Sequence, residues 1–161
     1  MPSSRKKVIV RKLSREWLAG YLPHADFAHQ GRIEMLDLAG KVVTLPLEEI
    51  KWLCYVRDFN SGEVDNPESL LRKSYAGRPR TEGLWLRLRL IDSDSIEGLA
   101  ANDLTLLDSS GIFLVPPDIR SNTQRMFIPR SSIAEFMVVA TIASPARRKA
   151  DGRPHQEDLF G

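Results

Sequence analysis

The chain has 161 residues, of which 42% are hydrophobic and 27% charged, and its formal net charge is +2 at pH 7. Its length allows one ordinary core or two small ones, and no apolar run is long enough for a membrane span or a signal-peptide core. The single cysteine, Cys54, excludes an intrachain disulfide and favours a reducing compartment. We therefore expect a cytoplasmic protein with no membrane partner, and the small net charge neither indicates nor excludes nucleic acid as a partner.

Short segments typical of β-strands fill the first third of the chain, and we call residues 8–56 the first copy. Gly20 stands inside one of these segments, where a glycine marks a bend or a close approach of backbones. Five short antiparallel strands in about fifty residues predict a small barrel of the SH3-like or Sm-like kind, which we place at residues 1–57. The strands are predicted at residues 8–13, 17–22, 32–36, 42–46 and 50–56.

The composition changes in residues 58–83, which we interpret as a linker. Its first part is rich in polar and turn-forming residues. Asn66 as cap, Pro67 at the first helical position and Gly77 at the end then predict a short helix at about residues 67–76.

A second set of strand patterns follows, and we call residues 84–139 the second copy. We place a second small barrel at residues 84–143. From residue 144 to residue 161 the chain is basic and rich in proline and glycine, which predicts a disordered tail. The strands are predicted at residues 84–91, 96–101, 111–115, 125–129 and 133–142.

The two sets of strand patterns align with each other, which indicates an internal repeat. Residues 42–56 align without a gap on residues 125–139, with Pro46 and Pro129 at the same place. A repeat sets the architecture of a chain, although two generic β-meanders would align in a similar way. The expected fold class is therefore mainly β, with two tandem five-stranded SH3-like or Sm-like barrels, one short helix between them and a disordered C-terminal tail.

Residues 66–139 resemble the Sm-like family, which includes the bacterial RNA chaperone of that fold and the archaeal and eukaryotic Sm proteins. The resemblance rests on the helix start at Asn66-Pro67, the strand and glycine of residues 88–98, and the blocks at residues 108–114 and 127–133. It implies a small barrel, and in that family two of these blocks line a uridine-binding pore. The whole chain also looks like an uncharacterised bacterial family of two-copy β-proteins, a similarity that implies no activity.

The positions that line the pore differ from the Sm-like pattern. Ser109, Ser110 and Gly111 follow the aspartate of the third block, and none of them is aromatic. Pro129-Arg130 replaces the arginine-glycine or lysine-histidine pair of the family's last block. The resemblance therefore does not predict uridine binding of the family's kind.

Candidate chemistry is sparse, and we expect a protein without catalytic residues, metal or cofactor. His24 and His29 flank Asp26, but this spacing suits no usual metal site and is more typical of a solvated loop. Cys54 lies in an apolar strand pattern, which favours a buried and inert thiol. Asp92-Ser93-Asp94-Ser95 between two strands is ordinary turn chemistry.

Two sets of basic residues are candidates for nucleic-acid binding. Arg87 and Arg89 lie on one face of a predicted strand, and the loop at residues 118–125 offers forked donors for phosphate or a base edge. A solvated face and a solvated hairpin loop are the alternatives. The full set of candidates is Arg87, Arg89, Arg120, Asn122, Arg125, Arg130, Arg147, Arg148 and Lys149.

The end of the chain resembles the peptide by which many bacterial replication and repair proteins bind the sliding clamp. Gln156, Asp158, Leu159 and Phe160 match its glutamine, acidic and apolar positions. The resemblance implies that the two apolar side chains enter a pocket of the clamp while the glutamine bonds to the rim. The alternative is that these two side chains fold back onto a barrel.

The sequence thus predicts a non-catalytic bacterial protein that binds a macromolecule. Our main expectation is association with RNA or DNA through the second barrel and the basic tail. The alternatives are a protein adaptor that docks its C-terminal peptide on a sliding clamp or a similar pocket, and a small-ligand sensor. The sequence leaves open whether strand edges join several copies into a homo-oligomer.

Overall fold

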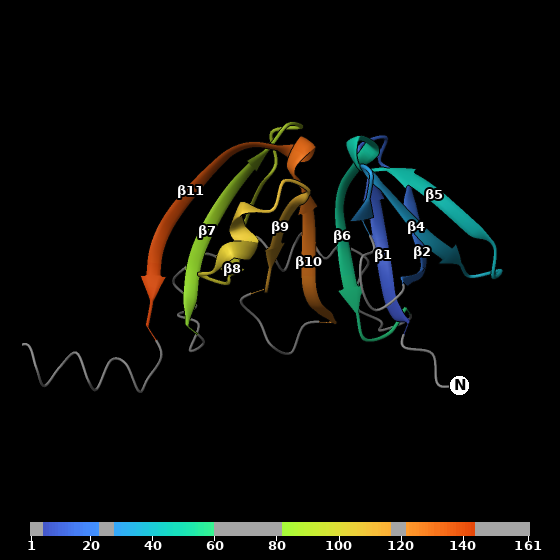
Figure 1. Cartoon of the computed structure of the whole chain (residues 1–161), viewed down its shortest axis with the longest axis horizontal. Coiled ribbons are helices and arrows are strands. Elements are labelled where there is room, and N and C mark those ends of the chain that lie inside the picture. Colours follow the sequence, from blue (N-terminus) through green and yellow to red (C-terminus); the bar gives the residue numbers. More distant parts are fainter. Residues whose placement is uncertain (1–4, 23–27, 60–81, 117–121, 144–161) are drawn as a thin grey trace, which may run out of the picture.

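The computed structural model describes residues 5–22, 28–59, 82–116 and 122–143, which are mainly β (Figure 1). The predicted strands are confirmed, whereas the two-residue strand β3 was not predicted. The predicted helix at residues 67–76 and the tail from residue 144 lie outside the described residues.

The first copy contains β1 (Lys6–Lys12), β2 (Trp17–Leu22), β3 (Ala28–His29), β4 (Arg32–Asp37), β5 (Val42–Pro46), the 3-10 turn η1 (Leu47–Glu49) and β6 (Ile50–Val56). The second copy contains β7 (Gly83–Leu90), β8 (Ser95–Ala100), η3 (Leu104–Leu107), β9 (Gly111–Leu114), β10 (Thr123–Pro129), η4 (Arg130–Ser132) and β11 (Ile133–Ile142).

The same strand order recurs in the two copies. In the first copy β6, β1, β2, β4 and β5 are neighbours in that order, and in the second copy β11, β7 and β8 are followed by β9 and β10. A single bridge between Leu99 and Val115 joins β8 to β9. The turns after β1 and β7 also match, because Arg15 and Ser93 both have a φ of 75°. These shared details support the internal repeat.

The sheets do not follow the boundary between the copies. β10 of the second copy pairs antiparallel with β6 of the first, which gives an eight-stranded sheet, while β11, β7 and β8 form a three-stranded sheet. Both sheets are open, so the two closed five-stranded barrels that the sequence predicted are not shown. The physical reason lies in the outer edges of β6 and β10, whose backbone groups pair with each other instead of remaining as sheet edges.

β6 takes part in two hydrophobic cores, and every one of its residues is buried. Leu53 and Tyr55 pack in the first core with β1 and with Phe127 of the second copy. Trp52 and Cys54 point to the other face and pack in the second core with the leucines of β7. Because side chains of a strand alternate between its faces, the apolar run from Trp52 to Val56 serves both cores. Cys54 is buried, as expected.

Two glycines at equivalent positions let a strand pass close to its neighbour. A Cβ at Gly20 would lie 2.1 Å from the carbonyl oxygen of Leu36, and a Cβ at Gly98 would lie 3.0 Å from that of Val115. We expect Gly20→Ala to lower the free energy of unfolding by about 1–3 kcal/mol, because the strand pair must separate. Urea unfolding monitored by circular dichroism measures this loss. Gly98→Ala is the matched control, because its added Cβ would lie 3.0 Å from the nearest atom instead of 2.1 Å and neither glycine has a positive φ. An equal or larger loss in Gly98→Ala would contradict the close contact at Gly20.

The described residues contain no helix that is both long and apolar enough to cross a membrane.

Candidate functional site

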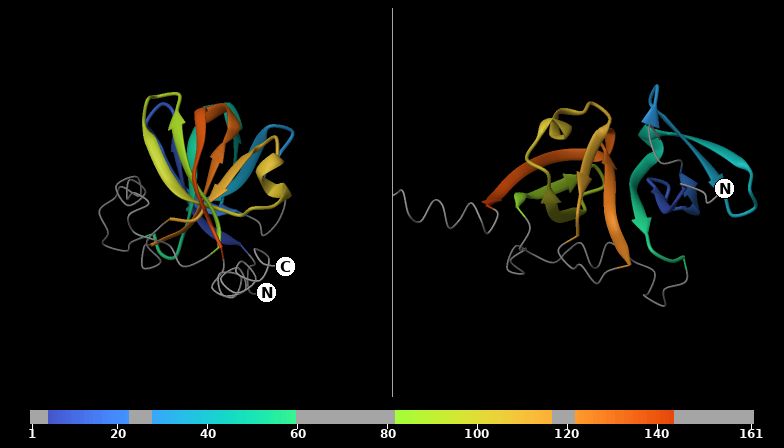
Figure 2. Two further views of the ribbon diagram at one scale, coloured as in Figure 1. Left: turned by 90° about the vertical axis from the view of Figure 1, so that its left-hand side faces the viewer. Right: turned by 60° about the horizontal axis from the view of Figure 1, so that its bottom comes forward.

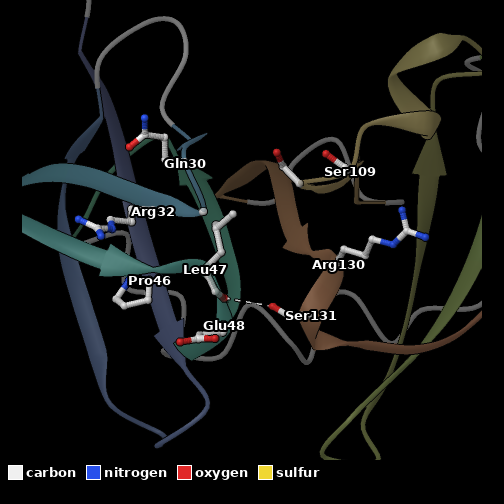
Figure 3. Close-up of a pocket in the computed structure, with 10 residues that line it drawn as sticks. Gln30, Arg32, Pro46, Leu47, Glu48, Ser109, Arg130 and Ser131 are labelled. Carbon is white, nitrogen blue, oxygen red and sulfur yellow. Dashed lines mark hydrogen bonds between the residues drawn. The ribbon is translucent and has the colours of Figure 1, made fainter.

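A polar cleft of about 600 Å3 lies between the two copies, where η1 and η4 lead into the last strand of each copy (Figure 3). Its walls come from the turn between β3 and β4, from η1, from the turn before β9, and from η4. The lining residues are Gln30, Gly31, Arg32, Pro46, Leu47, Glu48, Ser109, Ser110, Arg130 and Ser131.

Backbone hydrogen bonds hold the two walls in the same way. The N–H of Leu47 donates to the carbonyl oxygen of Gly31 at 2.9 Å, and the N–H of Arg130 donates to that of Ser110 at 2.9 Å. The hydroxyl of Ser131 then donates to the carbonyl oxygen of Leu47 at 3.3 Å (Figure 3). This last hydrogen bond joins the two copies at the cleft. The width of the cleft therefore depends on how the two copies are positioned relative to each other.

The cleft lining carries two cations and one anion. Arg32 and Arg130 are exposed, and in the described part of the chain neither forms an ion pair. Their side chains extend away from each other from opposite walls (Figure 3). Glu48 is the anion. Guanidinium groups donate to phosphate through a fork of N–H groups, and two separated forks with polar side chains between them suit an extended anion more than a small one.

Arg87 and Arg89, predicted to form a basic patch, are both paired with carboxylates. The Nε of Arg87 lies 3.3 Å from Glu97, and Nη2 of Arg89 lies 2.8 Å from Glu135. The hydrogen bond from Arg89, and then its charge, lower the pKa of Glu135. Each arginine is therefore neutralised by a neighbouring strand, which leaves little positive potential for a phosphate.

Arg125 and Asn122 hold the junction between β6 and β10. The guanidinium of Arg125 lies 4.4 Å from the ring centre of Phe113 and 4.7 Å from that of Tyr55, within cation–π range. Burial raises the pKa of Tyr55, and the charge and hydrogen bond of Arg125 act against that increase. The side chain of Asn122 accepts from the N–H of Asp58 at 3.0 Å and donates to its carbonyl oxygen at 2.8 Å. The structure thus gives both residues internal contacts.

The remaining predicted binding residues lie outside the described part of the chain. They are Arg120, Arg147, Arg148 and Lys149 of the nucleic-acid set, and Gln156, Asp158, Leu159 and Phe160 of the C-terminal peptide. Of the predicted set, Arg130 alone among the described residues lines the cleft.

Lys51 of β6 binds the aspartates of the turn between β7 and β8. Its side chain is only 6% exposed, and its Nζ lies 2.7 Å from Asp92 and also contacts Asp94. Burial by itself would raise the pKa of Asp92, but the hydrogen bond and charge of Lys51, together with backbone hydrogen bonds, lower it overall. The paired carboxylates therefore serve as an ionic link between the copies.

The described residues contain no group of three or more histidine, cysteine or acidic side chains placed to hold a metal. The spacing of His24, Asp26 and His29 in the sequence favoured a solvated loop over a metal site. Of these three residues, His24 and Asp26 lie outside the described residues.

A known protein family matches residues 4–140, a range that includes both copies. The chain belongs to the family of unknown function DUF6982. No curated protein and no solved structure matches the chain. The DUF6982 match ends before the C-terminal peptide, so membership adds no support for clamp binding, and the Sm-like resemblance also stays a prediction.

Sequence reasoning missed Arg32, Gln30 and Glu48 of this DUF6982 chain. For Glu48 a signal was present in the repeat, because the ungapped alignment places Leu47-Glu48 on Arg130-Ser131. Gln30 and Arg32 lie outside that alignment and carried no such signal. An alignment shows which positions are equivalent, but it does not show that the first copy's turns face those of the second. That information comes from the pairing of β6 with β10.

Proposed function

We propose that the protein binds single-stranded nucleic acid, RNA or DNA, without catalysis, and that the backbone of the strand passes through the cleft between the copies. The observation that carries this proposal is the pair of exposed arginines, Arg32 and Arg130, on opposite walls of one polar cleft. Phosphate contacts supply most of the affinity in sequence-tolerant binding. The site differs from the one predicted from sequence, which combined Arg87, Arg89 and the loop at residues 118–125 of the second copy with the basic tail.

The polar lining of the cleft favours a phosphate backbone over an apolar ligand. Gln30, Ser109 and Ser131 add neutral hydrogen-bonding side chains between the two cations, and protein contacts to phosphate use such side chains together with arginine. A small-ligand sensor would need an enclosed and mainly apolar pocket. The polar lining of the cleft supports nucleic acid over that alternative.

The SH3-like or Sm-like interpretation of each copy belongs to this proposal. It is supported by the strand order that recurs in both copies and by the equivalent turns that bound the cleft. Docking of the C-terminal peptide on a sliding clamp is a separate proposal, and it rests on the sequence of Gln156, Asp158, Leu159 and Phe160.

The test is fluorescence anisotropy of labelled single-stranded RNA, single-stranded DNA and duplex DNA titrated with the full chain at low and physiological salt. We expect Arg32→Ala combined with Arg130→Ala to weaken binding of single strands about tenfold or more at low salt. The slope of log affinity against log salt should become less steep by roughly 1 to 1.5, because each lost phosphate contact contributes about 0.7 for single strands.

The matched control removes two exposed cations away from the cleft, Lys6→Ala with Lys41→Ala. Both double variants lose the same net charge, so only the position of the charge differs. An equal loss of affinity in the two double variants would show that binding depends on overall charge and not on the cleft.

A truncation after Ser144 tests the contribution of the tail. If the truncated chain does not bind and the arginine variant binds normally, the binding site lies in the tail and not in the cleft. Absence of binding by the intact chain at low salt would reject nucleic-acid binding altogether.

A further inference from the structure

Two strands at opposite ends of the molecule each have one edge without a partner among the described residues. β5 pairs with β4 alone, and β11 pairs with β7 alone. β11 lies at one end of the long axis and β5 near the other, in Figure 1 and again in the right-hand view of Figure 2. An unpaired edge presents N–H and C=O groups that can pair with another strand.

One such pairing already exists inside the molecule, at the junction between the two copies. There β6, the last strand of the first copy, pairs antiparallel with β10, the fourth strand of the second copy. In the repeat, β11 is the counterpart of β6, and β5 is the counterpart of β10. The chain therefore carries both halves of a second junction of the same kind, but at opposite ends, where they cannot meet within one molecule.

The side chains of the β11 edge match those that the internal junction buries. Leu53, Cys54 and Tyr55 of β6 are at most 6% exposed, whereas their counterparts Phe136, Met137 and Val138 of β11 are 51%, 55% and 45% exposed. Soluble proteins usually guard a free edge with charges or proline. These three consecutive residues of β11 include neither, and a run of exposed apolar side chains marks an interaction surface.

The β5 edge offers a matching surface. Its sequence Val42-Val43-Thr44-Leu45-Pro46 contains no charged residue, and Val42 is 62% exposed. Its one proline, Pro46, ends the strand, as its counterpart Pro129 ends β10 beyond the residues that pair with β6. The internal junction pairs Phe127 with Leu53 and Met126 with Cys54. Carried over to the equivalent positions by the repeat, this register pairs Thr44 with Phe136 and Val43 with Met137, one residue in each pair coming from each molecule.

We propose that the β11 edge of one chain pairs antiparallel with the β5 edge of a second copy of the same chain. The two surfaces differ, so the contact is head-to-tail and leaves a free β5 and a free β11 at the ends of any pair. Such a contact closes into a ring or continues as a filament, depending on the rotation between neighbours. This assembly does not depend on nucleic-acid binding.

The first test is sedimentation velocity of the full chain over a range of concentrations, without nucleic acid. We expect species larger than one chain whose share rises with concentration, and we expect Met137→Glu or Val42→Glu to weaken the association at least about tenfold. Leu38→Glu is the matched control, because Leu38 is also 62% exposed but lies in the β4–β5 turn, off the edge. A chain that stays monomeric up to high micromolar concentration would overturn the proposal, as would assembly that both edge variants leave unchanged.

A cysteine pair tests the register and does not depend on the charged variants being well folded. Chains carrying Val43→Cys and chains carrying Met137→Cys should form a disulfide-linked dimer under mild oxidation when mixed, and neither should do so alone. The native Cys54 is buried and remains in place. A crosslink formed by the Met137→Cys chain with itself would indicate β11–β11 pairing and overturn the head-to-tail contact.

Discussion

Replacing Phe127 with alanine is expected to lower the free energy of unfolding by about 3–5 kcal/mol, the usual loss for a large aromatic side chain removed from a core. Phe127 is 2% exposed. It belongs to the second copy, but it packs in the core of the first copy beside Val10 and Leu53, and its ring centre lies 5.0 Å from that of Phe113. The cavity therefore weakens both copies, although the substitution lies in one of them.

Hydrogen exchange measured peptide by peptide distinguishes a shared core from two independent ones. We expect the amides of β1 and β10 to lose protection together in Phe127→Ala, since one cooperative unit opens as a whole. Phe136→Ala is the matched control, because Phe136 is 51% exposed, and its loss should stay below about 1 kcal/mol at low protein concentration. Loss of protection in the second copy while β1 stays protected would show that the copies unfold separately.

Replacing Lys51 with methionine is expected to lower the free energy of unfolding by about 2–3 kcal/mol at pH 7. Removal of one partner of a buried ion pair costs about 3–5 kcal/mol, and the value here is smaller because Asp92 and Asp94 are 37% and 33% exposed and keep some hydration. Methionine is close in length to the aliphatic part of the lysine side chain but carries no charge. The loss of free energy of unfolding therefore measures the contribution of the charge of Lys51. Lys41→Met at an exposed position is the control and should change little.

The same link predicts how stability depends on pH. The pKa of Asp92 is lower in the folded protein than its ordinary value of 3.8, so below this pH the unfolded chain binds more protons than the folded one. Its contribution is complete above pH 3.8 and is lost as the pH falls through the lower folded pKa. Urea unfolding between pH 7 and pH 2 should show this acid loss in the native chain and a smaller one in Lys51→Met. Identical acid profiles for the two proteins would contradict the role of the ion pair.

The strands were predictable because their signals are local. Alternating apolar residues and turn residues located each of the longer strands, and the shared proline and glycine positions revealed the repeat. β3 was missed because two residues are too few to form a pattern. The apolar pattern around Cys54 predicted a buried side chain, but no local pattern says which strands cover the two faces of β6.

The candidate site was only partly predictable, because residues far away in the sequence decide whether a charged side chain is paired or available to a ligand. Arg89 looks like a free cation on its strand, yet Glu135 lies opposite it, 46 positions further along the chain. Arg130 was recognised as a candidate, whereas Arg32 was not, since a single arginine at the start of a strand carries no signal of its own.

The sequence by itself determined the strand positions, the two copies and the equivalence between them, because these depend on the period of neighbouring side chains. Only the tertiary structure decided that β6 pairs with β10, that Lys51 binds Asp92 and Asp94 of the other copy, and that a cleft opens between η1 and η4. The physical reason is that pairing between strand edges uses backbone groups that every residue has. Which edge meets which is therefore set by the packing of both cores together, and no short stretch of sequence encodes it.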